Sequence, residues 1–228
     1  MINLKERSKK KEILDEDDLP FEDVKICIKE LNSINILLGG HAITLNGINC
    51  FYPDNKTYFK VCEIGSGGGD NLKAISKEFS NAGFTGIDLK KSCIDFSKLQ
   101  YKELNAEWIA SDYSKVQFTK KPDIIFSSLF CHHFSNEQIV LMLNWMKDNS
   151  RKGFFINDLQ RNTIAYYLIK WLTAIFSKSY MVKNDGPISV ARSFKKKDWQ
   201  LLFSKAGIND YSIKWKWAFR YLVVCKND

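Results

Sequence analysis

The sequence has none of the features of a membrane-spanning, secreted or disulfide-stapled protein. No run of eighteen or more apolar residues occurs in its 228 residues, so we expect no spanning helix. Residues 1–18 are charged and lack the apolar core of a secretory signal, which makes the cytoplasm the expected location. The six cysteines are scattered and form no Cys-x-x-Cys pair, a usage typical of reduced thiols rather than of a disulfide framework or a zinc module.

Signatures of nucleic-acid binding are also missing, although the formal net charge is +8. Much of the positive excess comes from short lysine runs at residues 9–11 and 195–197, which stand beside acidic residues. No zinc finger, RNA-recognition signature or aromatic-basic repeat accompanies them. We therefore interpret the charge as a solvated surface and expect no nucleic-acid partner.

What the sequence does have is a regular alternation of short apolar runs and helical patterns. Such alternation predicts a parallel, doubly wound sheet. The last two runs are joined by a link so short that only an antiparallel hairpin fits it. The predicted fold class is therefore α/β, a Rossmann-like sheet that is mostly parallel with a C-terminal antiparallel strand. The predicted strands are 58–64, 84–88, 107–110, 123–127, 153–156, 209–215 and 218–226, and the predicted helices are 70–79, 91–99, 136–147 and 195–205.

Two segments stand outside this alternation. Residues 1–56 are predicted as an appendage, with a solvated, charged tail to about residue 18 and a helix from Phe21 that ends at Gly39-Gly40. Residues 57–228 form the main domain, which an aromatic, partly helical insertion at about 159–192 interrupts. Three interpretations of the insertion are open: a buried helix, a lid over an acceptor, or a helix with weak contact to a membrane surface.

A glycine-rich turn follows the first strand of the main domain. Gly65 and Gly67 permit positive φ angles and close approach of a ligand to the backbone, and the following helix N-terminus offers free N–H donors. A nicotinamide-dinucleotide fingerprint needs a third glycine where Asp70 stands. The carboxylate of Glu63 would repel a pyrophosphate but attract an ammonium or sulfonium group. The turn therefore favours S-adenosylmethionine over NAD.

The same residues resemble a known family. Residues 63–69, E-I-G-S-G-G-G, look like motif I of class I S-adenosylmethionine-dependent methyltransferases. Residues 84–89, F-T-G-I-D-L, resemble motif II, residues 110–113, A-S-D-Y, resemble the segment after the third strand, and residues 122–129, P-D-I-I-F-S-S-L, resemble motif IV. Each motif stands at the C-terminal end of a predicted strand, where such sheets bind ligands. The resemblance implies S-adenosylmethionine as cofactor and S-adenosylhomocysteine as product.

The resemblance also implies a cofactor site. Asp88 would accept hydrogen bonds from the ribose hydroxyls and Asp112 from the adenine amino group. An aspartate at a strand end is equally well explained as a helix cap or turn former, so that alternative stays open. The implied cofactor-binding residues are Glu63, Gly65, Ser66, Gly67, Asp88, Leu89, Ser111, Asp112, Tyr113 and Ser128.

Two segments are candidates for the catalytic residues. His132 and His133 follow motif IV, and a similar Leu-His-His segment is common in methyltransferases resembling the ubiquinone and menaquinone enzymes. Adjacent histidines on an extended segment point opposite ways and no carboxylate stands at a ligand spacing, so no metal is expected. His133 is the candidate general base, and Asp158, after the fifth strand, is the second candidate catalytic residue. A capping or packing role is the alternative for both.

The expected reaction is methyl transfer to a small, hydrophobic acceptor. Residues 31–40 and 157–161 look similar to a bacterial subgroup associated with phenolic-lipid and aryl-polyene pathways. O-methylation of a phenolic, polyketide-like or lipid-like molecule is the first hypothesis. C-methylation of a quinone-like ring and a non-catalytic S-adenosylmethionine-binding protein are the alternatives.

Overall fold

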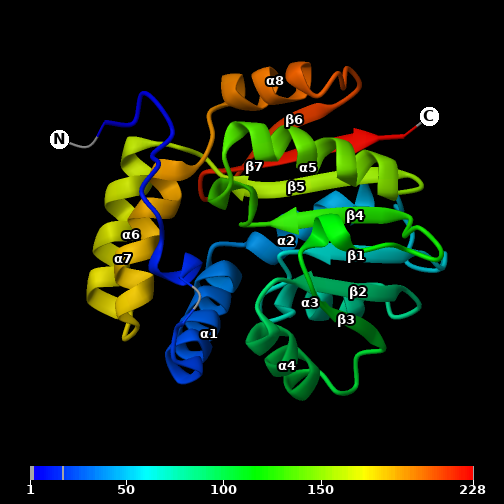
Figure 1. Ribbon diagram of the computed structural model, residues 1–228, viewed down its shortest axis with the longest axis horizontal. Helices are drawn as coiled ribbons and strands as arrows, with labels where there is room; N and C mark the ends of the chain where they lie inside the picture. Colours follow the sequence, from blue (N-terminus) through cyan, green and yellow to red (C-terminus); the bar gives the residue numbers. More distant parts are fainter. Residues whose placement is uncertain (1–2, 17, 228) are drawn as a thin grey trace.

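A seven-stranded sheet forms the centre of the protein in the computed structural model, which describes residues 3–16 and 18–227 (Figure 1). The strand order is β3-β2-β1-β4-β5-β7-β6. β7 runs antiparallel to both β5 and β6, and the other pairs are parallel. The predicted fold class is confirmed. The strands are β1 (Lys60–Ile64), β2 (Gly83–Asp88), β3 (Ala106–Ala110), β4 (Ile124–Ser128), β5 (Gly153–Leu159), β6 (Ser212–Lys216) and β7 (Arg220–Lys226).

Helices cover both faces of the sheet because its central strands are apolar on both sides. In β1, Val61 packs with the core under α2 and α3, whereas Cys62 and Ile64 pack with the core under α5 and α8. Continuous apolar strands of this kind are typical of doubly wound parallel sheets. The helices of the two layers are α2 (Gly40–Asn49), α3 (Asp70–Glu78), α5 (Asn136–Asn149) and α8 (Lys196–Lys205), with α4 (Lys91–Gln100) beside β2 and β3.

The appendage contributes two helices and an ordered strap. α1 (Phe21–Leu37) ends as predicted, because Gly39 takes a positive φ of 71° and the chain turns into α2. The expectation of a solvated tail is wrong for residues 3–16, the part of the tail that the structure describes. Arg7 donates hydrogen bonds to the carbonyls of His132, Phe134 and Arg192. These bonds and the burial of Leu4 tie the segment to the main domain.

The insertion forms two helices beyond the carboxyl ends of the parallel strands. α6 (Thr163–Phe176) and α7 (Tyr180–Arg192) stand side by side there, with the N-terminal segment running along them and α1 packed against α7 (Figure 1). Across the described residues, no helix has the length and apolar character needed to cross a membrane. These helices, α1 and the N-terminal segment enclose the end of the sheet where its functional residues lie.

Candidate functional site

The glycine-rich turn brings the backbone to the edge of a cavity. Gly65 and Gly67 adopt φ angles of 68° and 50°. A Cβ at Gly65 would lie 2.1 Å from the Phe130 ring, so only glycine fits there. At Gly67 a Cβ would meet no described atom within 4 Å, although Gly67 lines the cavity. The turn therefore leaves open space beside its own backbone, as close approach of a ligand requires.

The cavity has a volume of about 660 Å³ and brings together every residue of the expected cofactor site. It lies at the carboxyl ends of β1, β2 and β4, and α1 and the N-terminal segment close its far side. Its lining includes Glu63, Gly65, Ser66, Gly67, Asp88, Leu89, Ser111, Asp112, Tyr113 and Ser128. The residues that the sequence predicts to bind the cofactor therefore lie in one cavity. The role of each residue toward a cofactor stays a prediction.

Glu63 places an unsatisfied carboxylate oxygen at one end of this cavity. Its side chain is 1% exposed, and Asn71 donates a hydrogen bond of 2.7 Å to Oε1. Oε2 has no hydrogen-bond partner among the described residues. Burial raises the pKa of the Glu63 carboxyl well above its usual range. A buried oxygen without a donor is costly, and a cationic ligand group would relieve that cost.

Asp88 is both a turn former and a candidate ligand-binding group. Its Oδ2 accepts a 2.8 Å hydrogen bond from the Gly67 N–H, and its Oδ1 accepts one of 2.9 Å from the Lys90 N–H. Each carboxylate oxygen has a further lone pair that faces no described donor and suits a ligand diol. Burial raises the pKa of Asp88, against the effect of these two backbone donors.

The capping role predicted as the alternative for Asp112 is realised. Its Oδ1 accepts 2.9 Å hydrogen bonds from the N–H and the hydroxyl of Ser114, at the start of the 3-10 turn Tyr113–Lys115. Capping does not conflict with ligand binding, because Asp112 also lines the cavity. Leu89 lines the cavity too, and its side chain is 72% exposed.

These residues fit the cofactor that the sequence implies. The cavity offers a buried carboxylate oxygen for an ammonium group, a carboxylate for a ribose diol, and apolar Leu89 and half-buried Tyr113 for an adenine ring. The glycine turn adds a cradle that a side chain would fill.

A second, smaller chamber of about 250 Å³ adjoins the first. Leu14, Leu31, Asn35, Leu129 and His133 line both. The rest of its lining is mostly apolar and comes from α1 and the residue after it, the end of β5, α6, α7 and the β6–β7 turn. It includes Ile34, Leu38, Leu159, Leu168, Ile169, Leu172, Val182, Trp217 and Phe219. The insertion therefore faces a hollow beside the cofactor cavity.

Composition alone does not show which apolar side chains of α6 face the chamber. Leu168, Ile169 and Leu172 of α6 line the chamber, whereas Trp171 is 65% and Phe176 75% exposed. Periodicity identifies the two faces of the helix, but not which of two apolar faces turns inward.

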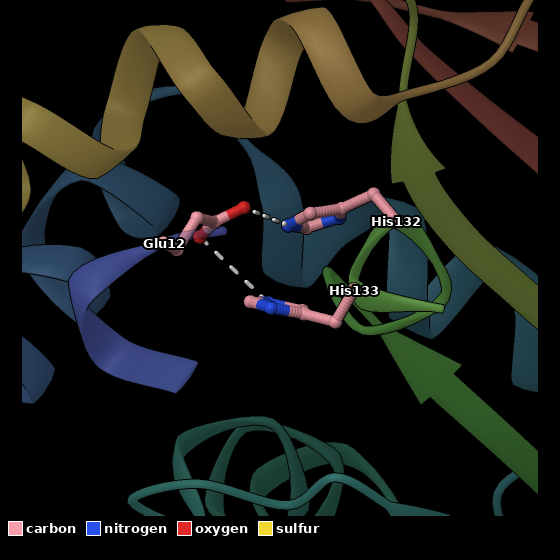
Figure 2. Close-up of side chains that lie close together, drawn as sticks. All are labelled: Glu12, His132 and His133. Atoms are coloured by element: carbon pink, nitrogen blue, oxygen red, sulfur yellow. Dashed lines mark ion pairs between the residues drawn. The ribbon is translucent and has the colours of Figure 1, made fainter. Parts of the chain in front are cut away.

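His132 and His133 lie in a 3-10 turn, η3 (Cys131–His133), and not in an extended segment. The expectation that their rings point opposite ways is therefore wrong, since the ring centroids are 4.4 Å apart and the rings are tilted by 32°. Figure 2 shows both rings pointing toward the carboxylate of Glu12, which comes from the N-terminal segment. The His132 Nε2 lies 3.7 Å from Glu12 Oε1, and the His133 Nε2 lies 3.9 Å from Oε2.

A second carboxylate stands behind each histidine. Asp158 Oδ1 lies 2.8 Å from His132 Nδ1, and Asp15 Oδ1 lies 2.6 Å from His133 Nδ1. Asp158 is fully buried and lines neither cavity, so it reaches the chamber only through His132. Burial raises the pKa of Asp158, but the charge and hydrogen bond of His132 outweigh it and the net pKa is lowered.

No sequence pattern pointed to Glu12 or Asp15, which lie about 120 residues before the histidines. Burial raises the pKa of Glu12 to about 7. Burial also raises the pKa of Asp15, but the hydrogen bond and charge of His133 bring that pKa to about 2. Within the charged tail, the apolar residues Leu4, Ile13 and Leu14 are the sequence signal that this segment is docked.

Comparison with known proteins bears on the cofactor cavity. Residues 61–153 match the family model of a methyltransferase domain. This range runs from β1 to the start of β5 and contains all ten expected cofactor residues. No curated protein matches the sequence.

Solved structures share the fold at low sequence identity. A protein from Aquifex aeolicus described as a SAM-dependent methyltransferase is 15% identical, with a TM-score of 0.65 and coverage of 92% of this chain and 99% of its own. The plantazolicin methyltransferase BpumL, in complex with SAH, is 18% identical, with a TM-score of 0.60 over 90% of this chain and 99% of its own. A candidate O-methyltransferase from Nostoc punctiforme is 15% identical with a TM-score of 0.62; the match covers 88% of this chain but only 60% of that longer protein.

Proposed function

Because the chain belongs to the class I S-adenosylmethionine-dependent methyltransferases, we propose that it methylates a hydroxyl oxygen of a small, hydrophobic, phenolic acceptor. The observation that carries the proposal is the apolar chamber of about 250 Å³ that adjoins the cofactor cavity. Leu129 and His133 line both spaces, which supports a reaction at their boundary. The cofactor of this enzyme is S-adenosylmethionine.

When bound, S-adenosylmethionine supplies an electrophilic methyl group with a neutral thioether as its leaving group. Glu63 would hold its ammonium group, and Asp88 its ribose. The protein's part is then to align the acceptor oxygen with the methyl carbon and to exclude water. The enclosure of both cavities by α1 and the N-terminal segment supports that role.

The size of the chamber limits the acceptor. A volume of about 250 Å³ lies just below the roughly 300–1,000 Å³ of pockets that hold drug-sized molecules, so one or two rings fit better than a long polyene. The β6–β7 turn contributes to its wall with Ala218 and Phe219 at φ angles of 61° and 55°. Non-glycine residues in that conformation are strained, and such strain concentrates at binding sites.

The chamber is lined by one buried cationic side chain, that of Arg220. Arg220, at the start of β7, lines it and is 2% exposed, and its Nε and Nη1 have no hydrogen-bond partner among the described residues. Burial lowers the pKa of its guanidinium to about 10, so it remains charged at neutral pH. An unpaired buried guanidinium binds carboxylates in bidentate fashion. We therefore propose that the phenolic acceptor also carries an acidic group.

His133 is the residue proposed to activate the acceptor hydroxyl, because it lines both cavities. The hydroxyl must lose its proton as the oxygen attacks the methyl carbon. Asp158 would act through His132 as a positioning residue, since it touches neither cavity.

The outer face of α6 is a candidate for weak contact with a membrane surface. Its exposed large apolar side chains that do not line the chamber recur at helical spacing: Ile164, Tyr167, Trp171, Ile175 and Phe176. Apolar residues on one exposed helix face suit an interfacial position, from which a lipid-like acceptor would enter.

A transfer assay with a trideuteromethyl-labelled cofactor tests the proposal. The acceptors are naphthols, alkylphenols and hydroxybenzoic or hydroxynaphthoic acids, and each product is located by mass spectrometry and NMR. We expect a methyl ether of an acidic phenol, with Arg220→Gln raising KM for that acceptor at least tenfold and leaving KM for the matching neutral phenol unchanged. Methylation at carbon would favour the quinone-like alternative, and S-adenosylhomocysteine binding without any product would favour a non-catalytic binding protein.

A further inference from the structure

Three side chains from two distant segments meet at the wall of the acceptor chamber. Glu12, His132 and His133 all line it, and their ligand-type atoms lie within 4.8 Å of one another (Figure 2). We propose that these residues bind a divalent transition-metal ion, with an open coordination position toward the chamber.

The chemistry of the three groups fits such an ion. Two imidazole nitrogens and one carboxylate form the protein ligand set of many catalytic zinc sites and of non-haem iron sites, both of which keep a position open for another ligand. The measured separations of 3.7 Å and 3.9 Å are too long for hydrogen bonds. Bonds of about 2.0–2.2 Å to one ion would bring such atoms to roughly 3–3.5 Å, a small contraction.

The groups behind the histidines support the assignment. Metal-binding histidines usually donate their other ring N–H to a carboxylate, which fixes the ring and leaves the free nitrogen lone pair for the metal. Both histidines have this arrangement, with Nδ1 of His132 on Asp158 at 2.8 Å and Nδ1 of His133 on Asp15 at 2.6 Å. The two Nε2 atoms face Glu12, at 3.7 Å and 3.9 Å, and in neutral imidazoles that donate from Nδ1 they carry the free lone pairs.

Glu12 supplies an independent observation. Its side chain is 3% exposed, and its Oε1 has no hydrogen-bond partner in the described part of the chain. The nearest guanidinium, of Arg192, stays 3.9 Å away from that oxygen. Arg192 instead donates to the carbonyls of His132 and His133 and to Asp15, and so holds the site's backbone together. A buried carboxylate between two imidazoles, with one oxygen left without a donor, is well matched by a cation.

The consequence for catalysis rests on the proposed function. An ion with an open position at the chamber wall would polarise the acceptor oxygen and lower the pKa of its hydroxyl. The O–H bond then breaks with the proton leaving to solvent, and the oxygen's electron pair forms the new C–O bond as the C–S electron pair returns to sulfur. In this account His133 activates the acceptor hydroxyl through the ion that it binds, rather than by accepting the proton directly.

Metal binding can be measured without any acceptor. Tag-free, full-length protein is stripped with a chelator and titrated with Zn²⁺ in competition with a chromophoric chelator, and with Co²⁺ while its visible absorption bands are recorded. We expect one ion per chain and Co²⁺ bands of a low-coordinate nitrogen–oxygen site. Glu12→Gln and His133→Gln should each weaken Zn²⁺ binding at least tenfold, and Asp15→Asn by about 10–100-fold, as expected for a group that orients a ligand.

His41→Gln is the matched control, because His41 lies outside both cavities and should keep wild-type zinc affinity. Circular dichroism and the melting temperature of each variant establish that it is folded. If wild-type protein binds much less than one equivalent, or if the His41 and His133 variants bind alike, the metal site is rejected.

The two proposals fail separately. Full phenol methylation by metal-free protein in excess chelator would reject the role of the ion and keep the proposed function. One bound ion with no phenol methylated would keep the site and reject the proposed acceptor.

Discussion

Substitution of Gly67 by alanine tests whether the glycine-rich turn binds the cofactor or is only a turn. Its φ is 50°, and a Cβ there would meet no described atom within 4 Å, so alanine meets no steric obstacle in the free protein. Gly207, which follows α8, has a φ of 69° and equally open space, but lines neither cavity. Gly67→Ala and Gly207→Ala therefore introduce the same backbone strain in two places, only one of which faces a ligand.

The magnitudes follow from that comparison. Placing a non-glycine residue in the left-handed region costs about 1–2 kcal/mol. For a domain of this size roughly 1 kcal/mol corresponds to about 2–4 °C, so both variants should lose about 2–8 °C in Tm. The Cβ that Gly67→Ala introduces would occupy space that the methionine part of the cofactor needs, and we expect at least a tenfold loss of affinity, or about 1.4 kcal/mol.

Differential scanning fluorimetry gives Tm, and isothermal titration calorimetry with S-adenosylhomocysteine gives the affinity. Equal losses of Tm with a loss of affinity only in Gly67→Ala would support the assignment. Wild-type affinity in the Gly67 variant, or the same loss of affinity in both, would refute it, because strain alone would then explain the data.

Three further predictions concern the two cavities. Asp88→Ala should weaken cofactor binding about ten- to a thousand-fold, because charge-assisted hydrogen bonds of about 1.5–3 kcal/mol each are lost. Asp123→Ala is the control, since Asp123 accepts a hydrogen bond from the Lys60 N–H at the end of another strand. This control variant should lower Tm and leave cofactor affinity unchanged in calorimetry. Because burial raises the pKa of Glu63, its protonated form stabilises the free protein, and this contribution is lost as pH rises through the pKa of the folded state. An ammonium ligand favours the ionised carboxylate instead, so cofactor binding should release a proton. Titrations in buffers of different ionisation enthalpy should detect this proton release in the wild type and not in Glu63→Gln. Leu168→Ala should lower kcat/KM for the acceptor on the order of tenfold and leave cofactor affinity unchanged. Trp171→Ala on the same helix should lower only binding to anionic vesicles. Loss of turnover in the Trp171 variant would contradict the placement of the helix.

The cofactor half of the site could be predicted from the sequence because its determinants are local. Each residue of that half stands at the end of a short apolar strand, and parallel strands bring their carboxyl ends to one edge. Glu63, Asp88 and Asp112 follow that rule, and the cavity collects all three. The capping of Ser114 by Asp112 shows that the structural and the ligand-binding explanations of one residue need not exclude each other.

The acceptor half could not be predicted, because its residues meet through tertiary packing. Glu12 reaches the histidines from a charged tail, and Arg220 from the first residue of β7. The orientation of the histidines depends on the 3-10 turn η3, which begins at Cys131. Leu129, just before it, has a φ of 53° that is rare for leucine. No spacing rule signals that turn, so an extended segment was the natural but incorrect expectation.

The N-terminal segment connects the two halves. Leu14 lines both cavities, Asp15 faces the cofactor cavity and Glu12 faces the chamber. Asp185 of α7 holds the segment by accepting the N–H groups of Ile13 and Leu14 at 2.8 Å and 2.9 Å. One short turn of chain therefore forms a wall of the cofactor cavity, supports His133 and contributes the carboxylate of the proposed metal site.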